Sequence, residues 1–236
     1  MKVVVWSENI HEKHMPLVTE LYPGGLHGYI ASFLGTDEEI EVTTATLDDA
    51  DCGLTDEVLN NTDVLVWWGH AGHHLVPDEV VDRVQNHVLA GMGLVVLHSG
   101  HHSKIFRRLM GTTCHLKWRD DAKERIWTIA PNHPIAEGVP ETFVLEPEEM
   151  YGEQFDIPTP DDVIFIGWFN GGEVFRSGCT WTRGHGKVFY FQPGHETNPS
   201  FKNENVQRII TNGVKWACPI KKNIPLICPQ FEALEK

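Results

Sequence analysis

The sequence predicts an α/β protein with one mainly parallel sheet, and three observations support this prediction. Short apolar runs rich in β-branched residues alternate with segments of helical spacing through the first half of the chain. Further short runs, broken by Pro, Gly and Asn, make the second half richer in strands. The 236 residues suffice for one domain with a substantial core. We expect this domain at residues 1–218, followed by a C-terminal surface extension at residues 219–236.

The strands of the first half are expected where apolar runs have the length of a strand buried on both faces. These runs are residues 3–7, 41–47, 64–68 and 94–98. The clearest helix follows Pro77, a residue favoured in a first helical turn; four valines share its buried face, and Gly91 ends it. A second helix is expected from about Asn203 to Trp216, with apolar residues spaced to cover the sheet. This alternation indicates βαβ units.

The strands of the second half are expected at shorter runs between turn residues. They are residues 126–130, 143–145, 163–168, 179–183 and 188–192. Residues 183–187 have the glycines that a hairpin turn between the last two runs requires. We therefore expect additional β-strands in the C-terminal half.

The composition narrows the classes of partner. The chain has 19 Lys and Arg against 33 Asp and Glu, a formal charge of −14, which repels phosphate backbones and anionic lipid surfaces. We expect no nucleic-acid or membrane partner and no nucleotide cofactor. The sequence does not decide whether the protein forms a homo-oligomer. Met1 is followed directly by an apolar run of strand length without a signal-peptide pattern, and the five cysteines are odd in number and widely spaced. A cytoplasmic protein with reduced thiols is the expectation.

Histidines gather at the carboxyl ends of the expected strands, where an open parallel sheet has its ligand crevice. The residues in these positions are His70, His73, His74, His98, His101, His102 and His195. Imidazole titrates near neutrality and binds first-row metals, so such a group suits proton transfer or a metal site. For His98 and His195, each at a strand-to-loop junction beside glycine, we favour a functional role.

The other histidines leave alternatives open. His73, His74 and His102 lie in flexible loops and are interpreted as exposed or supporting residues. His70 and His101 can contact a ligand directly or support residues that do. The choice between these roles depends on where the loops place the rings.

Three further patterns carry candidate chemistry beside a plainer alternative. Residues 97–100 follow the layout of a nucleophile elbow with His98 at its exposed apex, before a helix expected near residue 103; Ser99 is a nucleophile candidate without the usual G-x-S-x-G context. The segment from Glu148 to Tyr151 supplies an acid or base, or forms a solvated loop. Tryptophans near strand ends, such as Trp68, suit stacking on sugars, although most tryptophans are core residues.

A set of motifs spread over most of the chain resembles one known family. The motifs are residues 25–30, 93–99, 114–115, 133–134, 148–151, 181–190 and 194–195. In this order they resemble the ThuA-like family of trehalose-utilisation proteins, from Met1 to about Ala217. The resemblance implies a three-layer, flavodoxin-like fold of the class I glutamine amidotransferase type, with helices on both faces of the sheet. It also implies a role in sugar metabolism beside dehydrogenases that make 3-keto sugars.

The chain departs from true amidotransferases at the elbow, and from the commoner ThuA-like pattern at two other places. Amidotransferases have a cysteine at the elbow apex, whereas this sequence has His98, so we expect no glutaminase activity. Residues 8–23 form a long segment before the His27 motif, and Glu148 stands where an aspartate is usual. These departures leave the substrate open.

The leading hypothesis is one pocket that binds a sugar or 3-keto sugar and moves a proton beside its carbonyl group, as in an isomerase, lyase or hydrolase. The catalytic candidates are His98, His195, Glu149 and Tyr151. The substrate-binding candidates are His27, His70, Trp68, Arg183 and Ser99. Zinc is the candidate cofactor, with His27, His98 and His195 as its ligands. The rival hypothesis is a non-catalytic sugar-binding or regulatory module on the same fold.

Overall fold

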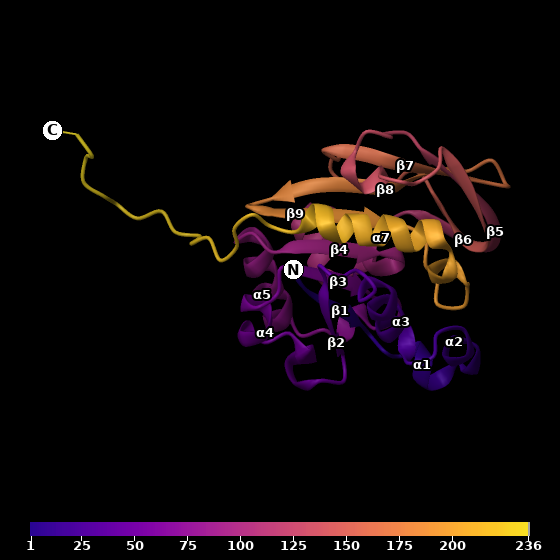
Figure 1. Ribbon diagram of the computed structural model, residues 1–236, viewed down its shortest axis with the longest axis horizontal. Helices are drawn as coiled ribbons and strands as arrows, with labels where there is room; N and C mark the ends of the chain where they lie inside the picture. Colours follow the sequence, from indigo (N-terminus) through magenta and orange to yellow (C-terminus); the bar gives the residue numbers. More distant parts are fainter. Residues whose placement is uncertain (236) are drawn as a thin grey trace.

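Five parallel strands form one half of a nine-stranded sheet in the computed structural model, which describes residues 1–235 (Figure 1). The strands follow the order β2-β1-β3-β4-β9-β8-β7-β5-β6. The parallel strands are β1 (Lys2–Ser7), β2 (Glu41–Thr46), β3 (Val64–Trp68), β4 (Gly93–Leu97) and β9 (Gly186–Phe191). Each expected strand of the first half is confirmed, with its end moved by a residue at most. The carboxyl ends of these strands therefore meet along one edge, as the sequence predicts.

The other half of the sheet is antiparallel and continues from β9. Its strands are β8 (Val174–Arg183), β7 (Asp162–Phe169), β5 (Lys117–Thr128) and β6 (Thr142–Gly152). The sequence predicts strands at all four places, but β5 and β6 extend well beyond the expected runs. The first part of β5, from Lys117 to about Ala122, pairs only with β6, so the two strands form a ribbon beyond the body of the sheet.

Helices cover both faces of the parallel half because its strands alternate buried side chains in both directions. Val4 and Trp6 of β1 belong to the apolar cluster on one face, and Val3 and Val5 belong to the cluster on the other. Helices α4 (Asp56–Asn60), α5 (Asp78–Leu89) and α6 (Lys104–Met110) pack on the first face. Helices α3 (Gly25–Leu34) and α7 (Glu204–Ala217) pack on the second. The short helices α1 (His11–His14) and α2 (Pro16–Leu21) connect β1 to α3 in the chain and lie at the periphery, beyond α3 from β1 in the view of Figure 1.

Helix α7 begins at a side-chain cap that a stability measurement can test. The carboxamide oxygen of Asn203 accepts hydrogen bonds from the backbone N–H groups of Asn205, at 2.9 Å, and Val206, at 3.4 Å. Replacing Asn203 by alanine is expected to lower the free energy of unfolding by about 1 kcal/mol, because two amide groups of the first turn lose their acceptor. Urea denaturation measures the change. Asn203→Asp, which keeps the acceptor, is the control, and an equal loss in both variants would contradict the capping role.

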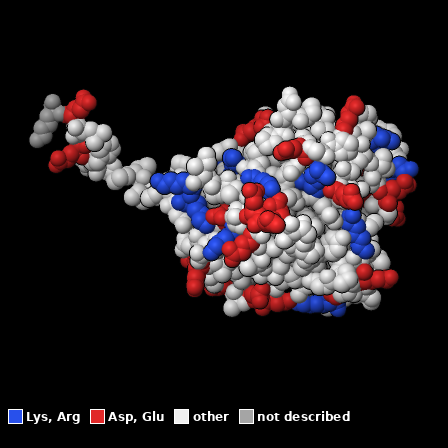
Figure 2. Space-filling view, viewed as in Figure 1, with Lys and Arg blue, Asp and Glu red and all other residues white. Residues whose placement is uncertain are grey.

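The chain after α7 first follows the body of the protein and then leaves it. Lys222 Nζ forms an ion pair with Asp63 Oδ1 at 2.7 Å, and the N–H group of Ile224 donates to the carbonyl oxygen of Ala90 at 2.9 Å. Beyond this point the described residues have no helix or strand and extend away from the sheet (Figure 1). Figure 2 shows acidic and basic side chains interspersed over one face of the protein. Within residues 1–235, every helix is too short or too polar to cross a membrane.

Candidate active site

A cavity of about 460 Å³ lies beside the carboxyl ends of β3 and β4 and the start of the β5–β6 ribbon. Its volume falls in the range of small-molecule sites. Its lining is rich in imidazole: His70, His73, Ser99, His101, His102, His115, Leu116, Trp118, Asp120, Glu149, Tyr151 and His195. The sheet therefore brings five of the expected histidines, from three strand ends, to one place: His70, His73, His101, His102 and His195. It adds side chains from the segment around the start of β5.

The elbow after β4 holds its apex side chain inside the protein. His98 has φ 51°, the left-handed conformation that a sharp turn requires, and a Cβ on Gly100 would lie 2.8 Å from Val96 Cγ1. A 3₁₀ turn over His98–His102 follows, and α6 begins only at Lys104, capped by Ser103. The prediction that the apex side chain is exposed is wrong. The His98 side chain has no exposed surface and stacks on the Tyr151 ring, with 5.1 Å between centroids.

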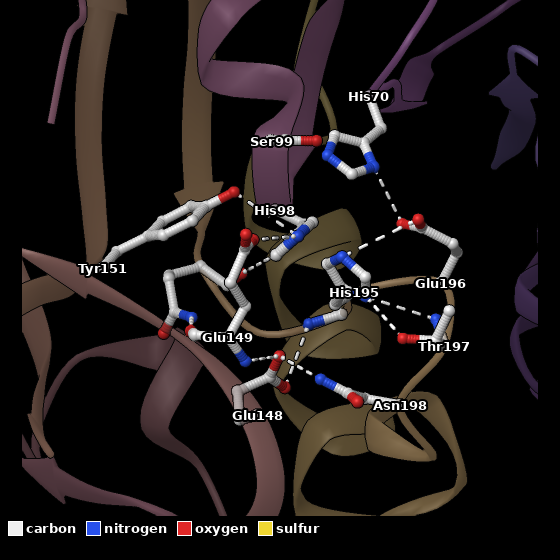
Figure 3. A network of polar contacts seen from close by, with 12 residues as sticks. His70, His98, Ser99, Glu148, Glu149, Tyr151, His195, Glu196, Thr197 and Asn198 are labelled. Atoms are coloured by element: carbon white, nitrogen blue, oxygen red, sulfur yellow. Dashed lines mark hydrogen bonds and ion pairs between the residues drawn. The ribbon is translucent and has the colours of Figure 1, made fainter. Parts of the chain in front are cut away.

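His98 forms a buried pair with Glu149, whose side chain lines the cavity (Figure 3). The Nδ1–H group of His98 donates to the carbonyl oxygen of Gln192 at 2.9 Å, and its Nε2 lies 3.0 Å from Glu149 Oε2. Burial alone lowers the pKa of His98, but the hydrogen bond and charge of Glu149 raise it above its usual value. Burial alone raises the pKa of Glu149, but His98 brings it below its usual value. The pair thus favours an imidazolium beside a carboxylate.

Tyr151 completes this wall of the cavity. Its hydroxyl lies 3.4 Å from His98 Nε2, and its ring packs at 5.3 Å from the His101 ring. Burial, followed by the charge of Glu149, raises the pKa of Tyr151 well above its usual value. Because the phenol stays protonated, it offers the cavity a proton donor held against an imidazole.

His195 approaches the same pair from the loop after β9. Its ring lies 5.4 Å from the His98 ring between centroids, and its Nδ1 lies 2.9 Å from Thr197 Oγ1. Burial and then the charge of His98 lower the pKa of His195 to about 4. Two neighbouring imidazoles with pKa values shifted in opposite directions are typical of sites that transfer protons.

The loop that holds His195 is fixed by a buried glutamate below it. The Glu148 carboxylate accepts hydrogen bonds from the N–H group of Gly194 at 3.3 Å and from Asn198 Nδ2 at 3.4 Å, and it also accepts one from the Ser200 hydroxyl (Figure 3). The N–H group of Glu149 donates to it at 2.9 Å. Glu148 therefore ties β6 to the loop of residues 194–200 and sets the distance between Glu149 and His195.

A second group of polar side chains surrounds Glu196. His70 Nδ1 lies 2.9 Å from Glu196 Oε2, and His11 Nδ1 lies 3.4 Å from Glu196 Oε1. One ligand atom from each of these three residues lies within 4.8 Å of the others, and the same holds for His98, Glu149 and His195. Sequence reasoning missed His11 and Glu196, although Glu196 directly follows His195 and His11 follows the end of β1 by four positions.

The remaining candidates divide between the cavity and other places. Ser99 lines the cavity, but its hydroxyl donates to the carbonyl oxygen of Gly69 at 2.7 Å. Trp68 is buried, and its Nε1–H group donates to the carbonyl oxygen of Gly194 at 3.0 Å, which supports the His195 loop. His70 lines the cavity as expected for a binding residue.

The structure does not bring His27 or Arg183 to the cavity wall. His27 lies on α3, with its Nδ1 2.9 Å from the Ser7 hydroxyl, and it belongs to neither group of possible metal ligands. Arg183 ends β8, which runs antiparallel to β9, so it lies at the opposite end of the strands from His195. Its guanidinium donates to the carbonyl oxygen of Leu109.

Comparison with known families places the chain. The sequence matches the ThuA family, described as trehalose utilisation, over residues 2–217. The chain belongs to the ThuA family. No curated protein matches the sequence.

Solved structures with the same fold have few identical residues. A ThuA-like protein of Parabacteroides merdae has 15% identity and a TM-score of 0.64, over 94% of this chain and 92% of that one. A cytoplasmic protein of Salmonella typhimurium has 12% identity and a TM-score of 0.65, over 93% of this chain and 100% of that one. PurLQS of Thermotoga maritima has 12% identity and a TM-score of 0.54, over 91% and 98%. The expected α/β fold of the amidotransferase type is confirmed.

The elbow of this ThuA protein carries imidazole where an amidotransferase has its thiol. Cys114 and Cys179 are buried among apolar side chains, and burial raises the pKa of Cys114 to about 11 and of Cys179 to about 12. A thiol with such a pKa is a poor nucleophile at neutral pH. The absence of glutaminase activity stays a prediction.

Proposed function

We propose that this ThuA protein is an acid–base enzyme of sugar metabolism that moves a proton at the carbon beside the carbonyl group of a bound 3-keto sugar. The observation that carries the proposal is the wall formed by Glu149, Tyr151 and His195 around the buried ring of His98. The family's description as trehalose utilisation supports a sugar substrate. A cytoplasmic location is part of the proposal, because the Salmonella neighbour is described as a cytoplasmic protein.

The roles follow from which groups reach the cavity. Glu149 lines it as a carboxylate and takes the proton from the carbon, leaving the electron pair in an enediolate. Tyr151, whose hydroxyl is held by His98 Nε2, gives its proton to the substrate's carbonyl oxygen as the negative charge forms there. His195 lines the same wall and hydrogen-bonds the substrate. His98 has no exposed surface and acts as a positioning residue for Glu149 and Tyr151.

Deuterium exchange tests this reaction directly. Purified protein is incubated in D₂O with a panel of 3-keto glucosides. Proton NMR follows the signal of the hydrogen on the carbon beside the carbonyl group. We expect loss of that signal well above the rate in buffer and in boiled protein. If no 3-keto glucoside of the panel exchanges faster than in buffer, the proposed reaction is rejected.

A non-catalytic sugar-binding role is the second candidate, and the position of Trp118 favours it. Trp118 lines the cavity with 63% of its surface exposed, as a side chain that stacks on a sugar would. Calorimetry with disaccharides, compared between the wild type and His98→Ala, separates the candidates. Unchanged binding with lost turnover supports the enzyme, and lost binding without any reaction in the wild type supports the module.

A further inference from the structure

We infer that His11, His70 and Glu196 bind a divalent transition metal ion of the zinc class at the edge of the cavity. The ion would lie beside the acid–base wall, and none of its ligands belongs to the wall of Glu149, Tyr151 and His195 or is His98 behind it. This inference stands independently of the proposed reaction, because it concerns binding and not turnover.

The distances around Glu196 match those between ligands that share one ion. Two ligands about 2.0–2.1 Å from a tetrahedral zinc ion lie roughly 3.3 Å apart. The carboxylate of Glu196 lies 2.9 Å from His70 Nδ1 and 3.4 Å from His11 Nδ1. The rings of His11 and His70 stack with 5.1 Å between centroids, so both imidazoles face the carboxylate from one side of the loop. Two imidazoles and one carboxylate form the ligand set of a site that keeps an open position.

The charge balance around Glu196 points in the same direction. Its side chain is only 3% exposed, and within residues 1–235 its ion-pair partners are all histidines: His11, His70 and His195. A buried carboxylate without a lysine or arginine partner needs another positive charge close by. A divalent ion supplies that charge while the imidazoles remain neutral, which is the form that binds metals.

His11 provides a further reason, because its ring has few polar partners of its own. Among the described residues 1–235, its buried Nε2 has no hydrogen-bond partner, and its Nδ1 has the Met15 sulfur at 3.4 Å beside the Glu196 carboxylate. The short helix α1 places this ring against Glu196 across the end of β1. The segment of residues 8–23, which departs from the commoner family pattern, thereby gains a specific role in this chain.

The group of His98, Glu149 and His195 is the competing location, and its contacts favour another use. His98 has both ring nitrogens engaged, Nδ1 with the carbonyl oxygen of Gln192 at 2.9 Å and Nε2 with Glu149 at 3.0 Å. An ion bound by His98 Nε2 would displace the contact that holds Glu149. Within residues 1–235, the ring nitrogens of His11 and His70 have no comparable contact with a backbone carbonyl.

Zinc binding to untagged protein tests the inference. The protein is stripped with chelator and titrated with Zn²⁺ by calorimetry. The same titration is carried out on the variants His70→Gln, Glu196→Gln and His98→Gln. The control variant is His74→Gln, which changes an exposed histidine in the same loop as His70. We expect one equivalent of Zn²⁺ in the wild type, His98→Gln and His74→Gln. In His70→Gln and Glu196→Gln the affinity is expected to fall more than the roughly 10- to 100-fold that residues around the ligands contribute.

A second measurement guards against variants that fail to fold. Co²⁺ bound to the wild type should give visible absorption bands, and His11→Gln, a change on the short helix α1, should alter or abolish them without changing the melting temperature of the metal-free protein. Three outcomes overturn the inference: no Zn²⁺ binding by the wild type, binding abolished by His98→Gln but kept in Glu196→Gln, or the same affinity in every variant.

Discussion

Glu149→Gln is expected to lower the rate of deuterium exchange into a 3-keto glucoside about 10²- to 10⁴-fold, the range that a positioned acid or base contributes. The variant keeps the size of the side chain but removes the negative charge that accepts the proton. It also removes the partner that raises the pKa of His98, so the imidazole loses its charge as well. Both effects act on the same step, and we expect kcat to fall more than KM rises.

The control for this variant is Asp120→Asn. It removes a carboxylate that lines the same cavity but, within residues 1–235, forms no ion pair with a histidine. Its exchange rate should stay within a few-fold of the wild type. Thermal melting of both variants separates lost chemistry from lost folding, since Glu149→Gln leaves a buried imidazole with a weaker partner. Equal losses of rate in the two variants would show that the cavity's overall charge, and not the base, sets the rate.

Tyr151→Phe tests the proposed proton donor of the same wall while the base, Glu149, is unchanged. If Tyr151 donates the proton to the carbonyl oxygen, removal of its hydroxyl slows exchange while the Glu149–His98 pair stays intact. The ring also stays, so its stacking on His98 is kept. A variant with full exchange activity would assign the donor role to His195 instead.

The meeting of His98 and His195 could be predicted from sequence because a parallel sheet brings the carboxyl ends of its strands to one edge. Each histidine directly follows or lies close to a strand end, and the rings lie 5.4 Å apart. The same rule does not place a residue on a helix or on an antiparallel strand. His27 on α3 contacts Ser7 at the end of β1 and does not line the cavity, and Arg183 ends β8 opposite the start of β9.

The start of β5 could not be predicted for a different reason. Residues 117–121 are mostly charged, and none of their side chains is buried, so the apolar alternation of a half-buried strand is missing. Trp118 and Asp120 reach the cavity from this ribbon. Residues of such a two-stranded ribbon become part of a site only through the fold, and no local pattern indicates them.

Glu124→Gln is expected to make the protein less sensitive to rising pH, because Glu124 is a buried carboxyl group with one hydrogen-bond partner. Ser177 Oγ donates to its Oε1 at 2.9 Å, while the buried Oε2 has no hydrogen-bond partner in the part of the chain that the structure describes. Burial and then the charge of Glu148 raise the pKa of Glu124 well above its usual value. The folded protein therefore holds a proton that the unfolded chain releases near its ordinary pKa of 4.5.

The sign of the effect follows from that proton. Below about pH 4.5 the group is protonated in both states, so it does not change the stability of folding with pH. As the pH rises from there toward the raised pKa, the wild type loses stability, since folding must keep a proton bound or bury a charge. Glutamine cannot ionise, so the variant avoids this loss, which is about 1.4 kcal/mol for each pH unit over which the folded wild type keeps a proton that the unfolded chain has released.

Urea denaturation at pH 4.5 and pH 8 measures this difference, with Glu141→Gln, an exposed glutamate just before β6, as the control. The control should follow the wild type at both pH values. A Glu124→Gln variant whose free energy of unfolding differs from the wild type by the same amount at both pH values would mean that Glu124 is ionised in the folded protein. An ionised Glu124 would need a positive charge beside it. Its carboxylate instead lies against the Ser177 hydroxyl and against Gly167, which has no side chain.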